Sequence, residues 1–551
     1  MLAAPAPEQT RSASGALARA LGPGAQLIAP EHGTTLVVDW DACWLEGRRI
    51  EELSQWRALV AAGRLGEVNG AFALAWIAEG EVRLTRDAIG ERTLYYAKVP
   101  QGWIFASTIH ALLASGLVPR ELNLRGVAAY LSYAYLPGEE TLVEGVLEVL
   151  PGEVVHLPRG GGPTRRMPFW SVPPEVDTSA PLPPEGEEAL RQHLRTELEG
   201  AVLRRLPSGE KVGAFLSGGL DSSLVVALAK RLHDQEVITW SVSFGPEYRN
   251  ELPFSSLVAQ HCRTHHRIVE LSPRVILAHL DETIALHSDP IGDPLTVPNA
   301  LLFREASAEV GVVLNGEGGD PCFGGPKNLP MLLAELYGGV AGTEDESLAR
   351  ERSYLRAHLK CFDDFELALS PKMKEAVAAR PLEASLAPLF ANPRWKTIVG
   401  KLMALNLFLK GAHHILHKVD EVSAPFGMLA RAPLFDQRVA EVAFNAPPQL
   451  KLKGSVEKYL LKRAVEDVLP REIIERPKSG MLVPVEGWFQ DPLLPEARTR
   501  LLDGLSRWEL FDRKWLERLL SGKLGGLRPR HGVKIWLLIT LEAWLRTVLA
   551  R

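Results

Sequence analysis

Cysteine is scarce in this chain of 551 residues, which has only Cys43, Cys262, Cys322 and Cys361. No two of them have the CxxC spacing, so a zinc site and a disulfide scaffold are both disfavoured. No uninterrupted apolar run is long enough to cross a bilayer, and the first fifteen residues lack the apolar core of a signal peptide. These absences predict a cytoplasmic protein that does not use a membrane.

An excess of positive charge is also missing. Lys and Arg total 62 against 67 Asp and Glu, for a formal net charge of −5. Proteins that bind nucleic acid do so mainly through basic surfaces, so we expect no nucleic-acid partner. Hydrophobic residues make up 46% of the chain and charged residues 23%, a globular balance in a chain too long for one ordinary core.

Proline marks a division in the chain. The stretch 173–187, PPEVDTSAPLPPEGE, carries five prolines and little apolar content, which is typical of an extended linker. We therefore predict one domain over 1–172, a proline-rich linker over 173–187, and a second domain over 188–551.

The two predicted domains differ in their patterns. Before the linker, short strand-like runs such as TTLVVDW, FALAWIA, EVRLT and WIFAS dominate, with helical periods near 109–115 and 124–135, so the first domain should be α+β. After it, a helix over 188–206 precedes KVGAFL, SLVVALAKRL, VITWSVSF, LVAQHC and VGVVLNG. Strands that alternate with helices predict an α/β domain with a parallel sheet, and from about 329 onward the chain should be mainly helical.

The strongest chemical signal is the segment SGGLDSS, which lies between the strand KVGAFL and a helix. Glycines permit close backbone approach to an anion, the helix start adds free N–H groups, serine hydroxyls can donate to phosphate, and a carboxylate can hold a divalent cation. The chain has no GxxxxGK[ST] sequence, so this is not a Walker-type loop. The candidate phosphate-binding residues are Ser217, Gly218, Gly219, Asp221, Ser222 and Ser223.

This segment resembles the pyrophosphate-binding loop of the N-type ATP pyrophosphatases. Further segments resemble asparagine synthetases in the same order along the chain: GEGGD with CFGG after it, KVD followed by RAPLFD, the stretch 447–465, and the stretch 469–489 containing RPKSG. The resemblance runs from about 211 to 545. It implies a PP-loop synthetase domain that uses ATP and Mg²⁺ to adenylate a carboxylate, releases pyrophosphate and then forms an amide.

The resemblance also implies roles for matched residues. Asp221 and Asp320 would hold Mg²⁺, while the serines and glycines of SGGLDSS cradle pyrophosphate. Lys478 would be a fixed cation over the phosphates, and Lys458 a second cation that reaches the pyrophosphate. Glu317 would take a proton from the attacking nitrogen, as a general base within hydrogen-bond reach can do.

Two histidine-containing segments are weaker candidates. His413 and His417 in AHHILHK are four residues apart, a spacing that can bind a metal on a helix, but no HExxH pattern surrounds them. Hydrogen-bonded or solvated histidines are the favoured interpretation. The segment HCRTHHR over 261–267 is interpreted as the connection from a helix to the next strand.

The first domain resembles the glutaminase half of asparagine synthetases over 68–97, which implies an N-terminal-nucleophile hydrolase-like sandwich. Such a glutaminase needs a cysteine directly after the initiating methionine, because its α-amine is the base and its thiol the nucleophile. Residue 2 is Leu2 and the first cysteine is Cys43, which is expected to be a buried structural residue. Asp87 keeps its matching position without partners. We therefore expect glutamine hydrolysis to be lost.

Loss of the glutaminase leaves two kinds of amide-forming ligase open. One is an asparagine synthetase-like enzyme that uses free ammonia, and the other is a biosynthetic amide former related to β-lactam synthetases and lasso-peptide cyclases. The family has other residues at the positions of Pro321, Cys322 and Leu429, which favours an altered acceptor pocket. Glu317 disfavours close kinship with β-lactam synthetases, because those enzymes have Tyr at that position. The partners expected are a small-molecule or peptide carboxylate and ammonia or an amine, with a homodimer as one assembly that the family often forms.

Two further classes were weighed. A non-catalytic scaffold would have no physical need for SGGLDSS, Asp320, Glu317 and Lys478 together. A sulfur-inserting tRNA enzyme would need a catalytic cysteine pair and a basic surface, and the sequence contains neither.

Overall fold

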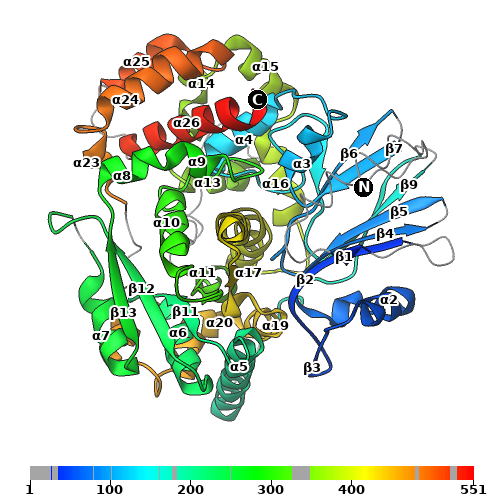
Figure 1. Cartoon of the computed structure of the whole chain (residues 1–551), viewed down its shortest axis with the longest axis vertical. Coiled ribbons are helices and arrows are strands. Elements are labelled where there is room, and N and C mark those ends of the chain that lie inside the picture. The colour runs from blue at the N-terminus through cyan, green and yellow to red at the C-terminus, as the bar shows by residue number, and fades with distance from the viewer. Residues whose placement is uncertain are drawn as a thin grey trace.

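The computed structural model describes residues 26–27, 35–78, 80–100, 102–159, 162–176, 183–248, 250–325, 348–477, 483–521 and 530–550. Figure 1 shows the early strands of the chain on one side, a second sheet on the other, and a helical layer above both. No helix within these described ranges has the length and apolar character needed to span a bilayer.

The first domain contains two antiparallel sheets. The larger has the order β1-β2-β4-β5-β9-β10 with β3 on β2, and the smaller has the order β7-β6-β8. The strands are β1 (Gln26–Leu27), β2 (Thr35–Leu45), β3 (Arg48–Arg49), β4 (Asn69–Ala78), β5 (Glu81–Arg86), β6 (Tyr95–Val99), β7 (Gly102–Ala106), β8 (Val146–Glu148), β9 (Glu153–Pro158) and β10 (Arg165–Pro168).

Alternation along the strands gives the larger sheet two buried faces. Ala73 and Ala75 of β4 pack with Tyr96 and Phe105 of the smaller sheet. Residues of the opposite parity, such as Phe72, pack under α2 (Leu53–Ala62), with the short turn η1 (Leu65–Glu67) beside it. Because side chains alternate across a strand, one sequence run serves both layers.

Helices α3 (Ile109–Ala114) and α4 (Leu124–Tyr133) cover the outer face of the smaller sheet. Each begins at a side-chain cap, Thr108 for α3 and Asn123 for α4, whose oxygen accepts a hydrogen bond from a backbone N–H of the first turn. The layers of the first domain therefore run helix, sheet, sheet, helix, which agrees with the α+β prediction. Its assignment to N-terminal-nucleophile hydrolases stays a prediction.

The second domain is built on a parallel sheet of order β13-β12-β11-β14-β15. Its strands are β11 (Val212–Phe215), β12 (Val237–Ser243), β13 (His265–Glu270), β14 (Val312–Leu314) and β15 (Leu429–Arg431). Every residue of β12 is buried, as expected for a strand with helices on both faces. On one face lie α5 (Pro184–Arg205), α6 (Leu220–Leu232) and α7 (Leu252–Cys262), and on the other lies α10 (Thr296–Ala306).

The parallel sheet confirms the α/β prediction, and the remainder after the sheet is mainly helical as expected. The further helical elements before residue 430 are α8 (Pro273–Ala278), α9 (Leu280–Ile284), α11 (Gly319–Phe323), α13 (Ala349–Ala357), η4 (Phe362–Asp364), α14 (Phe365–Ala368), α15 (Pro371–Ala379), α16 (Leu382–Phe390), α17 (Ile398–Leu405), the π-helical η5 (Asn406–Leu416), α18 (His417–Ser423) and η6 (Ala424–Phe426). After them come η7 (Pro433–Phe435), α19 (Gln437–Asn445), α20 (Pro448–Lys451), the hairpin β16 (Leu452–Lys453) and β17 (Val456–Glu457), α21 (Tyr459–Ala464), α22 (Arg471–Glu475), α23 (Val485–Trp488), α24 (Leu494–Thr499), η8 (Arg500–Gly504), η9 (Leu505–Trp508), α25 (Arg513–Leu520), α26 (His531–Trp544) and η10 (Leu545–Leu549).

Three local expectations need correction or refinement. The helix expected from residue 188 already begins at Pro184, so residues 184–187 of the predicted extended linker form its first turn; proline suits that position because it lacks an N–H to satisfy. The segment HCRTHHR is only partly a connection, since β13 begins at His265. The strand β15 lies in the region expected to be helical, and its three residues are too few to show a period.

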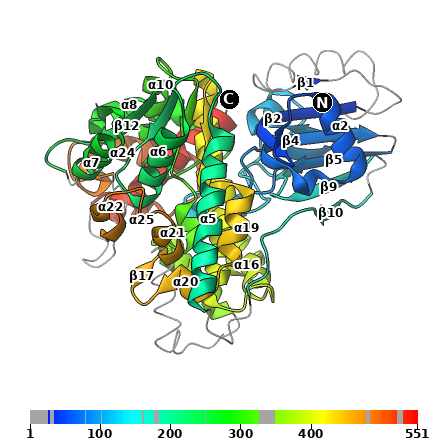
Figure 2. The same cartoon turned by 90° about the horizontal axis from the view of Figure 1, so that it is seen from below.

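The first domain is joined to the second by polar contacts along the seam next to α5 and α19 (Figure 2). Arg431 makes a bidentate ion pair with Asp41, both bonds being 2.7 Å long. Asn69 donates to Asp436 at 2.9 Å, and the indole of Trp44 donates to a carbonyl at the end of α5. These buried, directional contacts set the position of the first domain against the parallel sheet.

Candidate active site

The segment SGGLDSS forms the turn from β11 into α6. Gly218 has a φ of +77°, a backbone conformation that side chains disfavour, and a Cβ added there would lie 2.5 Å from the backbone nitrogen of Ser255. The hydroxyls of Ser217 and Ser222 lie 3.0 Å apart, and Ser217 also accepts from the N–H of Gly219 at 3.3 Å. The loop is thus held in shape by its own serines at the positive end of α6.

The segment GEGGD packs directly against this loop, although almost a hundred residues separate them. A Cβ on Gly316 would lie 2.4 Å from the backbone nitrogen of Ser222, and one on Gly319 would lie 2.2 Å from Oδ1 of Asp221. The glycines of the second segment are therefore needed for the contact, and they bring Asp320 and Asp221 into the same site.

A single ammonium group joins the two carboxylates. The Nζ of Lys458 lies 2.5 Å from Asp221 and 2.6 Å from Asp320, and the lysine side chain is 3% exposed. Burial would lower the pKa of Lys458, but the two carboxylates outweigh it and raise that pKa above its ordinary value. The lysine has a left-handed backbone between the hairpin β16–β17 and α21, which turns it toward the site.

A cavity of about 310 Å³ opens at the carboxyl ends of β11, β12 and β14. Its walls include Ser217, Gly219, Asp221, Ser222, Glu317, Asp320 and Lys458 from the predicted set. Ligands of open α/β sheets bind at this edge. One end of the cavity carries these charged groups, and an apolar part is lined by Phe215, Leu216, Trp240, Val242, Leu295, Leu302 and Val419.

Three predicted residues are not found in the wall of this cavity. Ser223 is fully buried and is not in the wall of the cavity, and its hydroxyl has no partner among the described residues. Lys478 belongs to residues 478–482, which lie outside the described part of the chain. Gly218 is also absent from the wall, and its carbonyl accepts a hydrogen bond of 2.9 Å from Arg476.

The structure adds cations that sequence reasoning missed. Arg476 lines the cavity, donates to Glu251 at 2.6 Å and lies 3.8 Å above the ring of Phe254. Lys462 also lines it, and burial lowers the pKa of this lysine. Arg476 lies two residues before Lys478 in the segment RPKSG, so a signal for this second cation is present in the sequence.

Glu317 lies in the cavity wall, and its backbone N–H donates to the side chain of Asn315 at 3.1 Å. The N–H of Asn315 in turn donates to the carbonyl of Arg431, the residue that pairs with Asp41 of the first domain. Lys418 lies on another side of Glu317. Burial would lower the pKa of this lysine, but the negative charges of Asp293 and Glu317 raise it. Two hydrogen bonds and an ion pair thus connect Glu317 to the first domain by way of Arg431 in β15.

The three histidines of AHHILHK have different neighbours. His413 bonds to Glu148 at 2.8 Å, and His417 bonds to Glu421 at 2.9 Å and to the hydroxyl of Tyr95. His414 stacks on Tyr135 and its pKa is lowered by burial to about 3. Within the described residues no three His, Cys, Asp or Glu side chains gather as metal ligands.

Asp221 and Asp320 nevertheless suit Mg²⁺. Two carboxylates already converge on one cation, and Mg²⁺ in phosphate-transfer sites is commonly held by one or two carboxylates with phosphate oxygens completing its shell. Serine hydroxyls and helix N–H groups for those phosphates lie in the same turn.

The remains of the glutaminase pattern have structural roles. Cys43 is fully buried, its thiol donates to the carbonyl of Ala71 at 3.2 Å, and burial raises its pKa well above the ordinary value. The carboxylate of Asp87 accepts from four successive backbone N–H groups, at 2.6 to 3.1 Å, in the turn after β5. Both side chains are therefore occupied in holding the fold.

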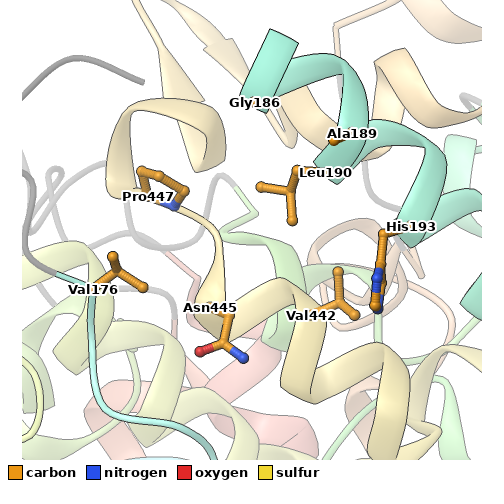
Figure 3. A pocket seen from close by; sticks show the side chains of 8 residues that line it. All are labelled: Val176, Gly186, Ala189, Leu190, His193, Val442, Asn445 and Pro447. Carbon is orange, nitrogen blue, oxygen red and sulfur yellow. The ribbon is translucent and has the colours of Figure 1, made fainter. Parts of the chain in front are cut away.

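A separate hollow of about 470 Å³ lies between α5 and α19, and Figure 3 shows the side chains that line it. It is lined by Val176, Gly186, Ala189, Leu190, His193, Val442, Asn445 and Pro447. It shares no residue with the predicted site and offers no anion-binding loop, so the chemistry described above belongs to the cavity at the sheet edge.

Comparison with known proteins shows the family of the chain. The asparagine synthase family matches residues 193–546, and a glutamine amidotransferase domain matches residues 57–170. The chain belongs to the asparagine synthase family. Membership of this family indicates that the protein is a ligase that uses ATP to form an amide.

Individual relatives are distant. The chain is 27% identical over 500 residues to a Mycobacterium tuberculosis protein provisionally named a glutamine-hydrolyzing asparagine synthetase, covering 86% of this chain and 76% of that one. It is 26% identical over 502 residues to glutamine-hydrolyzing asparagine synthetase 1 of Bacillus subtilis, covering 87% and 77%. It is also 23% identical over 494 residues to amidase chyE of Penicillium rubens, covering 78% and 72%.

Proposed function

We propose that this protein adenylates a carboxylate with ATP, releases pyrophosphate, and then transfers the activated acyl group to ammonia or an amine, leaving AMP. The carboxylate belongs to aspartate or an aspartyl-like side chain. The observation that carries the proposal is the convergence of SGGLDSS, GEGGD and a buried lysine on one charged cavity at the carboxyl edge of a parallel sheet.

Each part of the cavity has a task in that reaction. The Ser217 and Ser222 hydroxyls and the first turn of α6 bind pyrophosphate oxygens, while Asp221 and Asp320 hold Mg²⁺. Mg²⁺ held by these carboxylates would supply positive charge against the negative phosphates. Lys458 adds a fixed positive charge beside the same oxygens, which stabilises the charge that develops in the transition state.

The nitrogen step needs a base near the activated carbonyl. Glu317 lies in the wall of the cavity and is held by its backbone bond to Asn315. We assign it the removal of a proton from the attacking nitrogen. Lys478, outside the described residues, is assigned the second fixed cation over the phosphates.

Glutamine is not the nitrogen source in this proposal. The four cysteines of the sequence are all buried, and the one in the first domain donates its thiol proton within the core. A buried thiol whose pKa is raised supplies almost no thiolate. The first domain, of the N-terminal-nucleophile hydrolase type, then acts as a support that orients the strand β15 and the segment around Asn315.

A specialised amide or lactam former is the second candidate. Leu429 begins β15 where the family has a glutamate, and Pro321 and Cys322 are buried in α11, where the family has an acidic residue. These apolar replacements favour an acceptor other than aspartate. A relative named an amidase also belongs among the similar proteins.

Pyrophosphate release tests both candidates. The full chain is incubated with ATP and Mg²⁺ and with aspartate or an aspartyl peptide, with ammonium, an amine or glutamine as the nitrogen donor, and the product is identified by mass. Formation of an amide with ammonium or an amine, and no amide with glutamine, supports the proposal. Pyrophosphate release unchanged in Asp221→Ala would contradict the assigned site.

A further inference from the structure

A further cavity lies at the seam between the first domain and the helical part of the second. It has a volume of about 410 Å³ and shares no residue with the phosphate-binding cavity. Its apolar walls come from Tyr133, Leu136, Leu150, Trp170, Leu386, Leu389, Phe408 and Leu409. The volume lies within the range of small-molecule sites, which combine apolar walls with a few polar groups.

Most charged groups around this cavity are already paired. Arg125 and Arg380 both donate to Glu140, and Glu139 pairs with Arg166. Glu153 is the exception: it stands in the wall at the start of β9, and its buried Oε2 atom has no hydrogen-bond partner among the described residues. Burial alone raises the pKa of this carboxyl, because no cation offsets the loss of water.

A second atom without a partner stands in the same wall. His413 is 2% exposed, and its Nδ1 is hydrogen bonded to Glu148 at 2.8 Å. The other ring nitrogen, Nε2, has no partner among the described residues. Buried polar atoms without partners are costly unless a ligand pairs with them.

We propose that this cavity binds a small organic amine whose ammonium group pairs with Glu153 and whose apolar body fills the space between α4, α16 and η5. The chemistry follows from the wall: a cation satisfies the unpaired carboxylate, and the aliphatic and aromatic side chains bury the rest of the ligand. The helix η5–α18 runs past both cavities, with His413 in this one and Val419 in the other.

The test uses the full chain and two probes of the same shape. Calorimetric titration compares 2-phenylethylamine, which is protonated at neutral pH, with the uncharged 2-phenylethanol. The wild type should bind the amine about tenfold more tightly or better, since hydrogen bonds to a buried charge contribute this much. Glu153→Gln should abolish the preference, whereas the exposed control Glu144→Gln should retain it.

Two further arms locate the binding. Leu389→Trp, which fills the cavity from α16, should weaken both probes, and saturating ATP with Mg²⁺ should leave the amine affinity unchanged. Equal affinity for the two probes, a preference that survives Glu153→Gln, or displacement of the amine by ATP would each overturn the proposal. Failure of this site would leave the pyrophosphate chemistry of the other cavity unaffected.

Discussion

Replacing Lys458 with methionine tests the electrostatic design of the phosphate-binding cavity. The ammonium lies 2.5 and 2.6 Å from two carboxylates that are 17% and 21% exposed, so removing it leaves two like charges in a largely desolvated place. Breaking a buried ion pair costs roughly 3–5 kcal/mol, and the partial exposure of the carboxylates favours the lower end, about 3 kcal/mol.

Denaturation in urea, followed by tryptophan fluorescence, measures this cost. The account predicts that Mg²⁺ restores part of the lost stability in Lys458→Met, because the metal replaces the missing cation between Asp221 and Asp320. Pyrophosphate release should fall by about a hundredfold or more, as expected when a preorganised charge is lost from a transition state.

Lys230→Met is the matched control, because this lysine is exposed on α6 in the same domain. It should keep wild-type stability and activity, with no response to Mg²⁺ beyond that of the wild type. If Lys458→Met were as stable as the wild type and equally insensitive to Mg²⁺, the cavity would not be organised around that ammonium group.

Three further changes are predicted. Gly319→Ala should reduce pyrophosphate release at least about tenfold, since its Cβ would lie 2.2 Å from the loop carboxylate, whereas Gly311→Ala, with open space around it, should be neutral in the same assay. Asp41→Asn should lower the unfolding free energy by roughly 3 kcal/mol in denaturation, because it breaks a buried bidentate pair with Arg431; an unchanged value would show that the seam contributes little. His417, whose pKa is raised to about 9 by nearby carboxylates that outweigh burial, should stabilise the fold fully below about pH 6.5 and lose that effect as pH rises toward 9, so the stability gap to His417→Gln should close over this range.

Much of the scaffold could be predicted because its patterns are local. FALAWIA and VITWSVSF are short runs rich in apolar and β-branched or aromatic residues, which predict strands, and the structure has them as β4 and β12. The turn from β11 into α6 could also be predicted, since SGGLDSS combines glycines, hydroxyls and a carboxylate between a strand-like and a helix-like run. The strand β15 could not be predicted, because its three residues, which pair with β14, are too few to show a periodic pattern.

The long-range contacts of the site could not be predicted from the sequence. Nothing near Lys458 indicates that its ammonium group lies between Asp221 and Asp320, and nothing near Arg431 indicates a partner 390 residues earlier. Ser223 was expected to bind phosphate because hydroxyls suit that role, yet helical geometry turns this residue into the core while its neighbour Ser222 lines the cavity.

The transfer of a carboxylate oxygen to AMP tests the central claim most directly. The full chain is supplied with ATP, Mg²⁺ and ammonium together with aspartate, or an aspartyl peptide, whose carboxylates carry ¹⁸O, and the phosphorus products are measured by mass. The account predicts pyrophosphate and AMP in equal amounts, with one ¹⁸O in each AMP. Unlabelled AMP, or ADP and phosphate as the products, would contradict it.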